Sequence, residues 1–389
     1  MRKIYYKVFA SLLVISISGC KEQSDFSPLI TPESNLLSIS ENSLKSSHKT
    51  PAQRKKEADE LRVLYSKPQS QWPKAEIEIK EGVEYDEITS LPAVQFPSDN
   101  QYSPKRAELG KALFFDKRLS GSNALSCATC HNPAKGWADA KELPTGHLDT
   151  PLKRHSPGIL NLAYNTTFFW DGRAKSLEDQ AVAVLTNPNE MHATPEFIEE
   201  TFNKIPAYQK KFKEAYGIDR INIEYVTKAL ATFERTVVTK NQSPFDQFVK
   251  GNHNALSDSS IRGLHVFRTQ GRCMNCHSGA NFTDNKFHNL TLTYEGTEKE
   301  DLGRFNVTKD PKDWGKFKTP SLRNITETSP YMHNGIYEKL SKVLSFYNDG
   351  TNGKDPHKSV LIKSLSLSDE QLVDLEEFMK SLTESSSIK

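Results

Sequence analysis

The sequence predicts a mostly α-helical protein, and three observations support this prediction. Apolar residues recur at helical spacing within residues 105–115 and 224–238. Helix-capping residues precede several expected helices, as at Thr194, Ser257 and Ser368. No convincing run of alternating apolar and polar residues predicts a sheet. We therefore expect helices that are joined by short loops rich in Gly, Pro and Asn.

The sequence Cys-x-x-Cys-His occurs twice, at residues 127–131 and 273–277. In this motif both cysteines bond to vinyl groups of a porphyrin, and the histidine is an axial ligand of the iron. A zinc site would need two Cys-x-x-Cys pairs about 15–20 residues apart, whereas these pairs are separated by 146 positions (273 minus 127). A thioredoxin-like pair would need a βαβ context, and disulfides would not require the histidine. The motifs therefore predict two covalently bound haems, held by Cys127, Cys130, His131, Cys273, Cys276 and His277.

The N-terminus has the pattern of a secretory signal. Three basic residues precede an apolar run at residues 8–17 that is too short to span a bilayer. The run ends at Gly19-Cys20, which resembles a bacterial lipobox and predicts cleavage after residue 19 and a lipid anchor on Cys20. Ordinary cleavage near Gly19 is the alternative, although it would leave a free thiol in an oxidising compartment. Because Lys21 follows the cysteine, we expect a periplasmic lipoprotein on the outer membrane of a Gram-negative bacterium.

Charge and composition divide the rest of the chain. The 51 basic and 49 acidic residues give a net charge of +2, which becomes −1 when the three basic residues of 1–19 are removed. A chain this close to neutral argues against nucleic-acid binding. Residues 20–85 are rich in Ser, Pro, Lys and Glu and predict a flexible tether. Two haem domains are expected beyond it, at 86–240 and 241–389.

Five further segments carry a family resemblance. They are Leu-Gly-Lys-Ala-Leu-Phe-Phe-Asp at 109–116, Phe-Trp-Asp-Gly-Arg-Ala at 169–174, Phe-Glu-Arg-Thr at 233–236, Ser-Pro-Phe-Asp at 243–246 and Phe-Lys-Thr-Pro-Ser-Leu-Arg-Asn at 317–324. With these segments the chain resembles the bacterial dihaem cytochrome c peroxidases, which include the MauG-like enzymes. The resemblance implies two cytochrome c-like domains with one haem each. It also implies peroxide chemistry at the N-terminal haem, electron relay at the C-terminal haem, and possible homodimers.

The resemblance assigns roles around the first haem. Its catalytic Gln and Glu fall on Gln180 and Glu190, ten and twenty residues after Trp170. Peroxide reduction needs a group that moves a proton between the two peroxide oxygens, and a Glu190 carboxylate can do so while Gln180 orients the peroxide. Trp170 matches the tryptophan between the haems. His147 matches a distal ligand of relatives that require reductive activation, with a surface histidine as the alternative and His155 as a weaker candidate.

A calcium ion near the relay is also implied. Its carbonyl ligands match Thr328 and Pro330, but its Asn position falls on His155, and imidazole is a poor calcium ligand. The calcium is therefore an open expectation. Arg173 and Arg323 are expected to bind haem propionates or structural carboxylates.

The distal ligand of the second haem decides the subclass. The family position falls on Tyr347, which is the MauG-like arrangement, and Met332 and Met379 remain as alternatives. A phenolate oxygen is a hard anionic donor that favours ferric iron.

Three functions stay open from the sequence. The first is a MauG-like oxidase that uses hydrogen peroxide to oxidise a protein or other large substrate. The second is a peroxide-detoxifying peroxidase that receives electrons from a small c-type cytochrome or cupredoxin. The third is a membrane-anchored electron-transfer cytochrome, which would have no need of the proton-moving pair Gln180 and Glu190.

Overall fold

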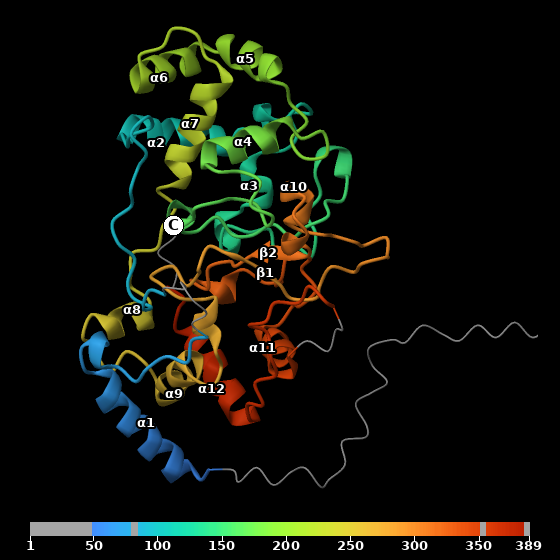
Figure 1. The fold of residues 1–389 in the computed structure, drawn as a ribbon. Helices are drawn as coiled ribbons and strands as arrows, with labels where there is room; N and C mark the ends of the chain where they lie inside the picture. Colours follow the sequence, from blue (N-terminus) through green and yellow to red (C-terminus); the bar gives the residue numbers. More distant parts are fainter. Residues whose placement is uncertain (1–48, 79–84, 351–354, 385–389) are drawn as a thin grey trace, which may run out of the picture. The chain divides into compact units, whose positions relative to one another are not determined.

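The computed structural model describes residues 49–78, 85–350 and 355–384. The signal peptide, Cys20 and the start of the expected tether lie outside these residues. The described chain is mostly helical, as predicted (Figure 1). Its α-helices are α1 (Pro51–Tyr65), α2 (Pro104–Phe114), α3 (Cys127–Cys130), α4 (Leu177–Thr186), α5 (Pro195–Asn203), α6 (Pro206–Tyr216), α7 (Ile223–Glu234), α8 (Pro244–Val249), α9 (Asp258–Arg268), α10 (Phe305–Thr308), α11 (Leu340–Asp349) and α12 (Asp369–Lys380). Two short strands, β1 (Phe287–Asn289) and β2 (Lys316–Lys318), pair antiparallel with Phe287 opposite Lys318.

The expected helix starts are confirmed. Thr194 caps α5, Ser257 caps α9 and Ser368 caps α12, each by accepting a hydrogen bond from a backbone N–H of the first turn. Ser368 and Gln371 form the capping box that the sequence predicts. Caps depend only on residues three apart, so the local sequence is enough to reveal them.

Two large hydrophobic clusters form the core, beside a small third cluster around Phe168 and Leu177. The first gathers buried residues of α2, α4, α5, α6 and α7, and the second gathers those of α1, α8, α9, α11 and α12. Each large cluster contains one very close helix crossing at a glycine. A Cβ on Gly110 of α2 would lie 1.9 Å from the carbonyl oxygen of Ala229 in α7, and a Cβ on Gly263 of α9 would lie 1.9 Å from that of Asp374 in α12. Only glycine permits helices to cross so closely, and each of the two large clusters has one such crossing.

The prediction of a flexible tether over 20–85 is wrong for residues 51–65. These residues form α1, which lies against α9 (Figure 1). Its side chains Ala58, Leu61 and Tyr65 are buried in the second cluster. Arg62 also donates a 2.9 Å hydrogen bond to Asp258. The three apolar residues are spaced for one helix face, but the polar residues between them concealed this stripe in the composition.

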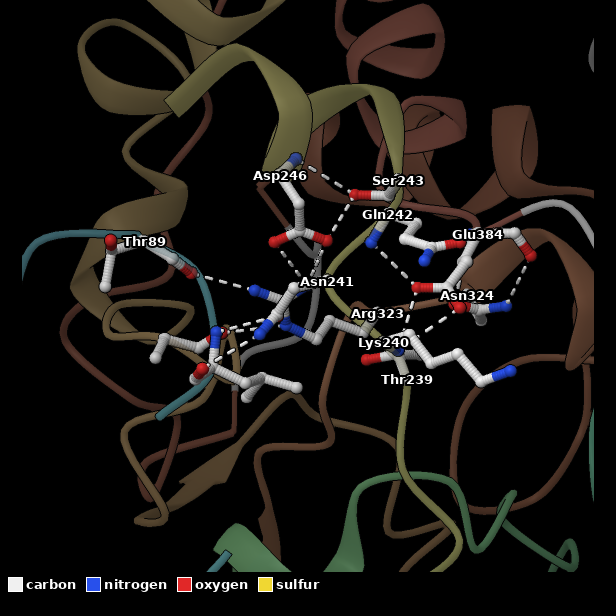
Figure 2. Close-up of polar contacts among 12 residues, drawn as sticks. Thr89, Thr239, Lys240, Asn241, Gln242, Ser243, Asp246, Arg323, Asn324 and Glu384 are labelled. Carbon is white, nitrogen blue, oxygen red and sulfur yellow. Dashed lines mark hydrogen bonds and ion pairs between the residues drawn. The ribbon is translucent and has the colours of Figure 1, made fainter. Parts of the chain in front are cut away.

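Polar contacts hold the segment between the two clusters (Figure 2). The Glu384 carboxylate accepts 2.9 Å hydrogen bonds from the backbone N–H groups of Lys240 and Gln242. Asn241 exchanges two hydrogen bonds of 2.9 Å with the backbone of Leu91. Leu91 and Glu384, which lie far before and far after this segment in the sequence, thus hold the stretch where we expected the domain boundary. No helix in the described ranges is long and apolar enough to cross a membrane.

Candidate active site

One cavity of about 1050 Å³ brings the two Cys-x-x-Cys-His motifs together. The residues that line it include both motif histidines, all four motif cysteines and most of the candidates from the sequence: Trp170, Arg173, Gln180, Glu190, Arg323, Thr328, Pro330, Met332, Tyr347 and Met379. His147 does not line it. Residues that are more than 200 positions apart in the chain therefore share one space.

Both motif histidines are oriented for iron ligation. Nδ1 of His131 lies 3.3 Å from the carbonyl oxygen of Trp137, and Nδ1 of His277 lies 2.9 Å from that of Phe282. A ring that donates its Nδ1–H in this way keeps the Nε2 lone pair free for a metal. Burial lowers the pKa of both rings, which favours the neutral form that binds iron.

The motif cysteines fit thioether formation. All four are free of disulfides. Burial raises their pKa values, to about 11 for Cys130 and about 12 for Cys273, so they are neutral thiols at neutral pH. A cavity with two such motifs and two available imidazoles fits two covalently bound haems c.

Glu190 and Gln180 lie in the same cavity on separate segments. Gln180 belongs to α4, and its side chain makes no hydrogen bond to another residue of the described chain. Glu190 follows α4 and accepts a 2.9 Å hydrogen bond from the Asn187 side chain. Burial raises the pKa of Glu190, while Arg173 and Asn187 act in the opposite direction. The carboxyl group is thus held in place and biased toward exchanging a proton nearer to neutral pH.

Trp170 lines the cavity and contacts residues of both expected haem domains. Its indole Nε1 donates a 2.9 Å hydrogen bond to the backbone oxygen of His155, and its own backbone oxygen accepts one of 2.8 Å from Lys318. Its ring meets that of His333 edge-on, with the centroids 6.4 Å apart. His333 in turn stacks on Phe317 at 3.5 Å. Trp170 is therefore held beside strand β2.

His147 packs away from the cavity. Its ring stacks on that of His192, with the centroids 4.2 Å apart and 13° between the planes. Its neighbours Thr145 and Gly146 do line the cavity, and its backbone N–H donates to Asn189. Its role as a distal iron ligand stays a prediction, and this arrangement of the loop does not bring the ring to the haem space.

The residues at the expected calcium position do not fit that ion. Thr328 and Pro330 line the cavity. His155, however, is buried with its Nδ1 2.9 Å from the carbonyl oxygen of Lys141, and it offers no side-chain oxygen. Because calcium prefers hard oxygen ligands, we assign no calcium here.

Three candidates for the distal ligand of the second haem remain. Tyr347 on α11, Met332 and Met379 on α12 all line the cavity. Tyr347 has no hydrogen-bond partner for its phenol among the described residues. Its pKa is raised by burial and by the neighbouring cysteines Cys276 and Cys273. A phenol in such a place loses its proton readily only when a cation compensates the charge.

The two candidate arginines, Arg173 and Arg323, have different partners. Arg323 is buried and forms an ion pair of 3.0 Å with the buried Asp246, so its partner is a structural carboxylate (Figure 2). Arg173 pairs with Asp171 at 3.0 Å but also lines the cavity and acts on Glu190.

Two buried ionisable residues of the cavity were missed from the sequence. Glu234, at the end of α7, lines the cavity, and burial raises its pKa to about 8. Lys318 on β2 also lines it, and burial lowers its pKa to about 8. The signal for Glu234 was available, because it lies four residues after Leu230 on the apolar face of its helix.

Comparison with known proteins shows the family of this chain. Residues 104–254 match the family described as di-haem cytochrome c peroxidase. The methylamine utilization protein MauG of Methylorubrum extorquens is 40% identical over 293 residues, which cover 75% of this chain and 81% of that protein. The cytochrome-c peroxidase IdrP1 of a Pseudomonas species is 36% identical over 324 residues, covering 76% and 85%. The chain therefore belongs to the di-haem cytochrome c peroxidase and MauG family, whose members carry two c-type haems and act on peroxide.

Solved structures share the fold. A crystal structure of a MauG-like protein associated with microbial copper homeostasis has a TM-score of 0.71 at 29% identity, covering 79% of this chain and 97% of the other. The diheme peroxidase BthA from Burkholderia thailandensis has a TM-score of 0.65 at 22% identity, covering 74% and 87%. The expected fold of two cytochrome c domains is thus confirmed at the level of the family.

Proposed function

We propose that this enzyme reduces hydrogen peroxide at the first haem and uses the oxidising equivalents on a protein or other large partner, as a MauG-like oxidase. The observation that carries the proposal is Tyr347. It lines the cavity beside Cys273 and Cys276, and its phenol has no protein hydrogen-bond partner in the described chain. The MauG protein of Methylorubrum extorquens, which is 40% identical over 293 residues, supports the proposal, although a cytochrome c551 peroxidase of Nitrosomonas europaea is also 40% identical, over 231 residues.

The chain's own residues would handle the protons of peroxide. When bound, the first haem supplies the iron that takes peroxide and the electrons for cleaving its O–O bond. The Glu190 carboxylate takes a proton from one peroxide oxygen and returns it to the other, which leaves as water. Asn187 holds this carboxylate, and Gln180 donates a hydrogen bond that orients the peroxide. A pure electron-transfer cytochrome would have no use for this arrangement.

One comparison tests the proposal. Ferric holoprotein is mixed with peroxide, with no prior reduction, and the haem spectrum is followed. A rapid spectral change is expected, because His147 packs on His192 and not into the cavity. Reaction only after half-reduction would instead support the detoxifying peroxidase that receives electrons from a small cytochrome or cupredoxin. That alternative has its own support in the cytochrome c551 peroxidase of Pseudomonas aeruginosa, which is 37% identical over 258 residues.

A ligand test addresses Tyr347 directly. In Tyr347→Phe the ring stays but the phenol oxygen is lost, so the spectrum of one haem should change while the other is unaffected. Met332→Leu and Met379→Leu are matched controls that remove the alternative donors and should leave both spectra unchanged. If a methionine variant changes the spectrum and Tyr347→Phe does not, the MauG-like assignment is wrong.

We also propose that the mature protein is lipid-anchored on the periplasmic side of the outer membrane. The sequence at Gly19-Cys20-Lys21 supports this proposal. Metabolic labelling with a radioactive fatty acid should mark the wild-type protein and not Cys20→Ser. A labelled Cys20→Ser protein would contradict the anchor.

A further inference from the structure

Lys318 is a buried cation that lines the haem cavity. It is 7% exposed and lies on β2, opposite Phe287 of β1. Its ammonium donates a 2.9 Å hydrogen bond to Oδ1 of Asn285 and a longer one, of 3.4 Å, to the backbone oxygen of Thr319. Both acceptors are neutral, and within the described ranges the ammonium forms no ion pair with a carboxylate. An ammonium has three N–H donors, so one of them has no acceptor in this part of the chain.

The other buried basic side chains of the described chain differ from Lys318 in this respect. Each is an arginine that pairs with a carboxylate: Arg235 with Glu178, Arg262 with Asp374, Arg268 with Glu87, and Arg323 with Asp246 (Figure 2 shows the last pair). Asp284, whose charge acts on Lys318, has its Oδ2 2.8 Å from Nε2 of His288 instead. Burying a charge without an opposite charge is costly. The described chain therefore leaves Lys318 without the counter-ion that a buried ammonium needs.

Lys318 is held in place at both of its ends. Its backbone N–H donates a 2.8 Å hydrogen bond to the backbone oxygen of Trp170. Asn285, which accepts from the ammonium, also accepts a 3.3 Å hydrogen bond from the backbone N–H of Thr166. These contacts hold the ammonium between β2 and residues 166–170.

The loop that receives the ammonium of Lys318 also contacts the second haem motif. In this loop, residues 282–285, the backbone N–H of Asp284 donates a 2.8 Å hydrogen bond to the backbone oxygen of Cys276. The backbone oxygen of the first loop residue lies 2.9 Å from Nδ1 of His277. A haem carries two propionates, so a haem bound at this motif brings two carboxylates into the cavity that Lys318 lines.

We propose that Lys318 binds a propionate of the second haem and is the counter-ion of that carboxylate in the holoprotein. The sequence predicted this role for Arg173 and Arg323, but Arg323 has its own buried partner, Asp246. The ion pair fixes one edge of the haem beside the backbone of Trp170. The proposal concerns the binding of the cofactor, and it holds whichever partner the enzyme oxidises.

Redox titration of the purified holoprotein tests the electrostatic consequence. Lys318→Met keeps a long side chain and removes the charge. Because a nearby positive charge favours ferrous over ferric iron, the variant should shift the equilibrium of one haem toward the ferric form by about tenfold, which is about 59 mV for one electron. Lys318→Gln removes the same charge but keeps a hydrogen-bond donor, and it should give the same shift if the methionine variant does not fold.

Lys316→Met is the matched control for the redox titration. Lys316 lies on the same strand, its amine is 3.4 Å from a carboxylate oxygen of Asp313, and it is not among the residues that line the cavity. Its loss should leave the potentials of both haems unchanged.

Denaturant unfolding of the same holoproteins distinguishes a paired ammonium from an unpaired one. If a propionate neutralises Lys318, Lys318→Met leaves that propionate buried without a partner, and the midpoint denaturant concentration should fall. If the ammonium is unpaired in the holoprotein, the variant removes an uncompensated buried charge, and the midpoint should rise.

Three results would overturn the proposal. They are unchanged potentials in both Lys318 variants, a higher unfolding midpoint in Lys318→Met, and a wild-type potential that depends on which small anion the buffer contains. The last result would mean that an anion from solvent, and not a propionate, neutralises Lys318. Peroxide turnover is not among these measurements, so each of these results leaves the proposed function standing.

Discussion

The surroundings of the two haem motifs differ in the kind of side chain that faces the cavity. Around the first motif these are polar and ionisable: Arg173, Gln180, Glu190 and Glu234. Around the second, α11 and α12 contribute mainly aliphatic side chains, and the phenol of Tyr347 stands among them. The first environment can move protons, whereas the second surrounds a single phenol whose pKa is raised by burial.

The same contrast extends to the supporting structure. Each half has one close helix crossing at a glycine, but their buried ion pairs differ. Arg323 and Asp246 in the second half have side chains that are 1% and 0% exposed, while Arg235 and Glu178 in the first half are 9% and 19% exposed. An ion pair that is shielded from solvent near the second haem motif suits a haem that keeps one fixed distal ligand. A more solvent-accessible ion pair near the first haem motif suits a haem that peroxide and protons must reach.

Breaking the two ion pairs should give the largest contrast. Asp246→Ala leaves Arg323 charged and without its buried partner, which should cost about 3–5 kcal/mol of unfolding free energy. Glu178→Ala is the matched change in the first half and should cost clearly less, because solvent reaches that pair. Denaturant unfolding of the holoproteins measures both. Equal losses of unfolding free energy in the two variants would contradict the difference that we infer between the two ion pairs.

Removing the carboxylate of the first haem comes next. Glu190→Gln should slow peroxide turnover by about 10²-fold or more. Since burial raises the Glu190 pKa and only the carboxylate accepts a proton, the wild-type rate should fall as the pH drops through this raised pKa, and recover above it. Asn187→Ala removes a hydrogen bond that lowers the pKa, so the fall should begin at a higher pH. A pH profile in Glu190→Gln with the same acid limb would exclude Glu190 as the titrating base.

The smallest effect concerns α1, which packs in the second hydrophobic cluster. Thr50→Ala removes the cap of α1 and should cost about 1 kcal/mol if this helix is part of the core. Ser368→Ala removes the equivalent cap and capping box of α12 and should cost a similar amount. Denaturant unfolding measures both variants. A loss in Ser368→Ala alone would mean that α1 contributes nothing to the folded unit.

Much of the site could be predicted because its signals are short. The haem cysteines and histidines follow each other within five residues, so attachment and proximal ligation need no tertiary information. The family resemblance pointed to Gln180 and Glu190 through their positions relative to Trp170, and the structure places all three in the cavity. Glu234 was missed although its position four residues after Leu230 places it on the apolar face of α7, while its contact with the cavity depends on how α7 packs.

By itself, the sequence determined the helical class, the helix caps and the covalent haem motifs, because each depends on residues a few positions apart. The tertiary structure decided what lies far apart in the chain. It placed α1 in the second core, gave Arg323 the buried partner Asp246 and stacked His147 on His192. It also brought the rings of Tyr347, Phe346 and Tyr337 into contact. The physical reason is that burial, and with it the behaviour of a charge or a phenol, is set by neighbours that only the folded chain brings together.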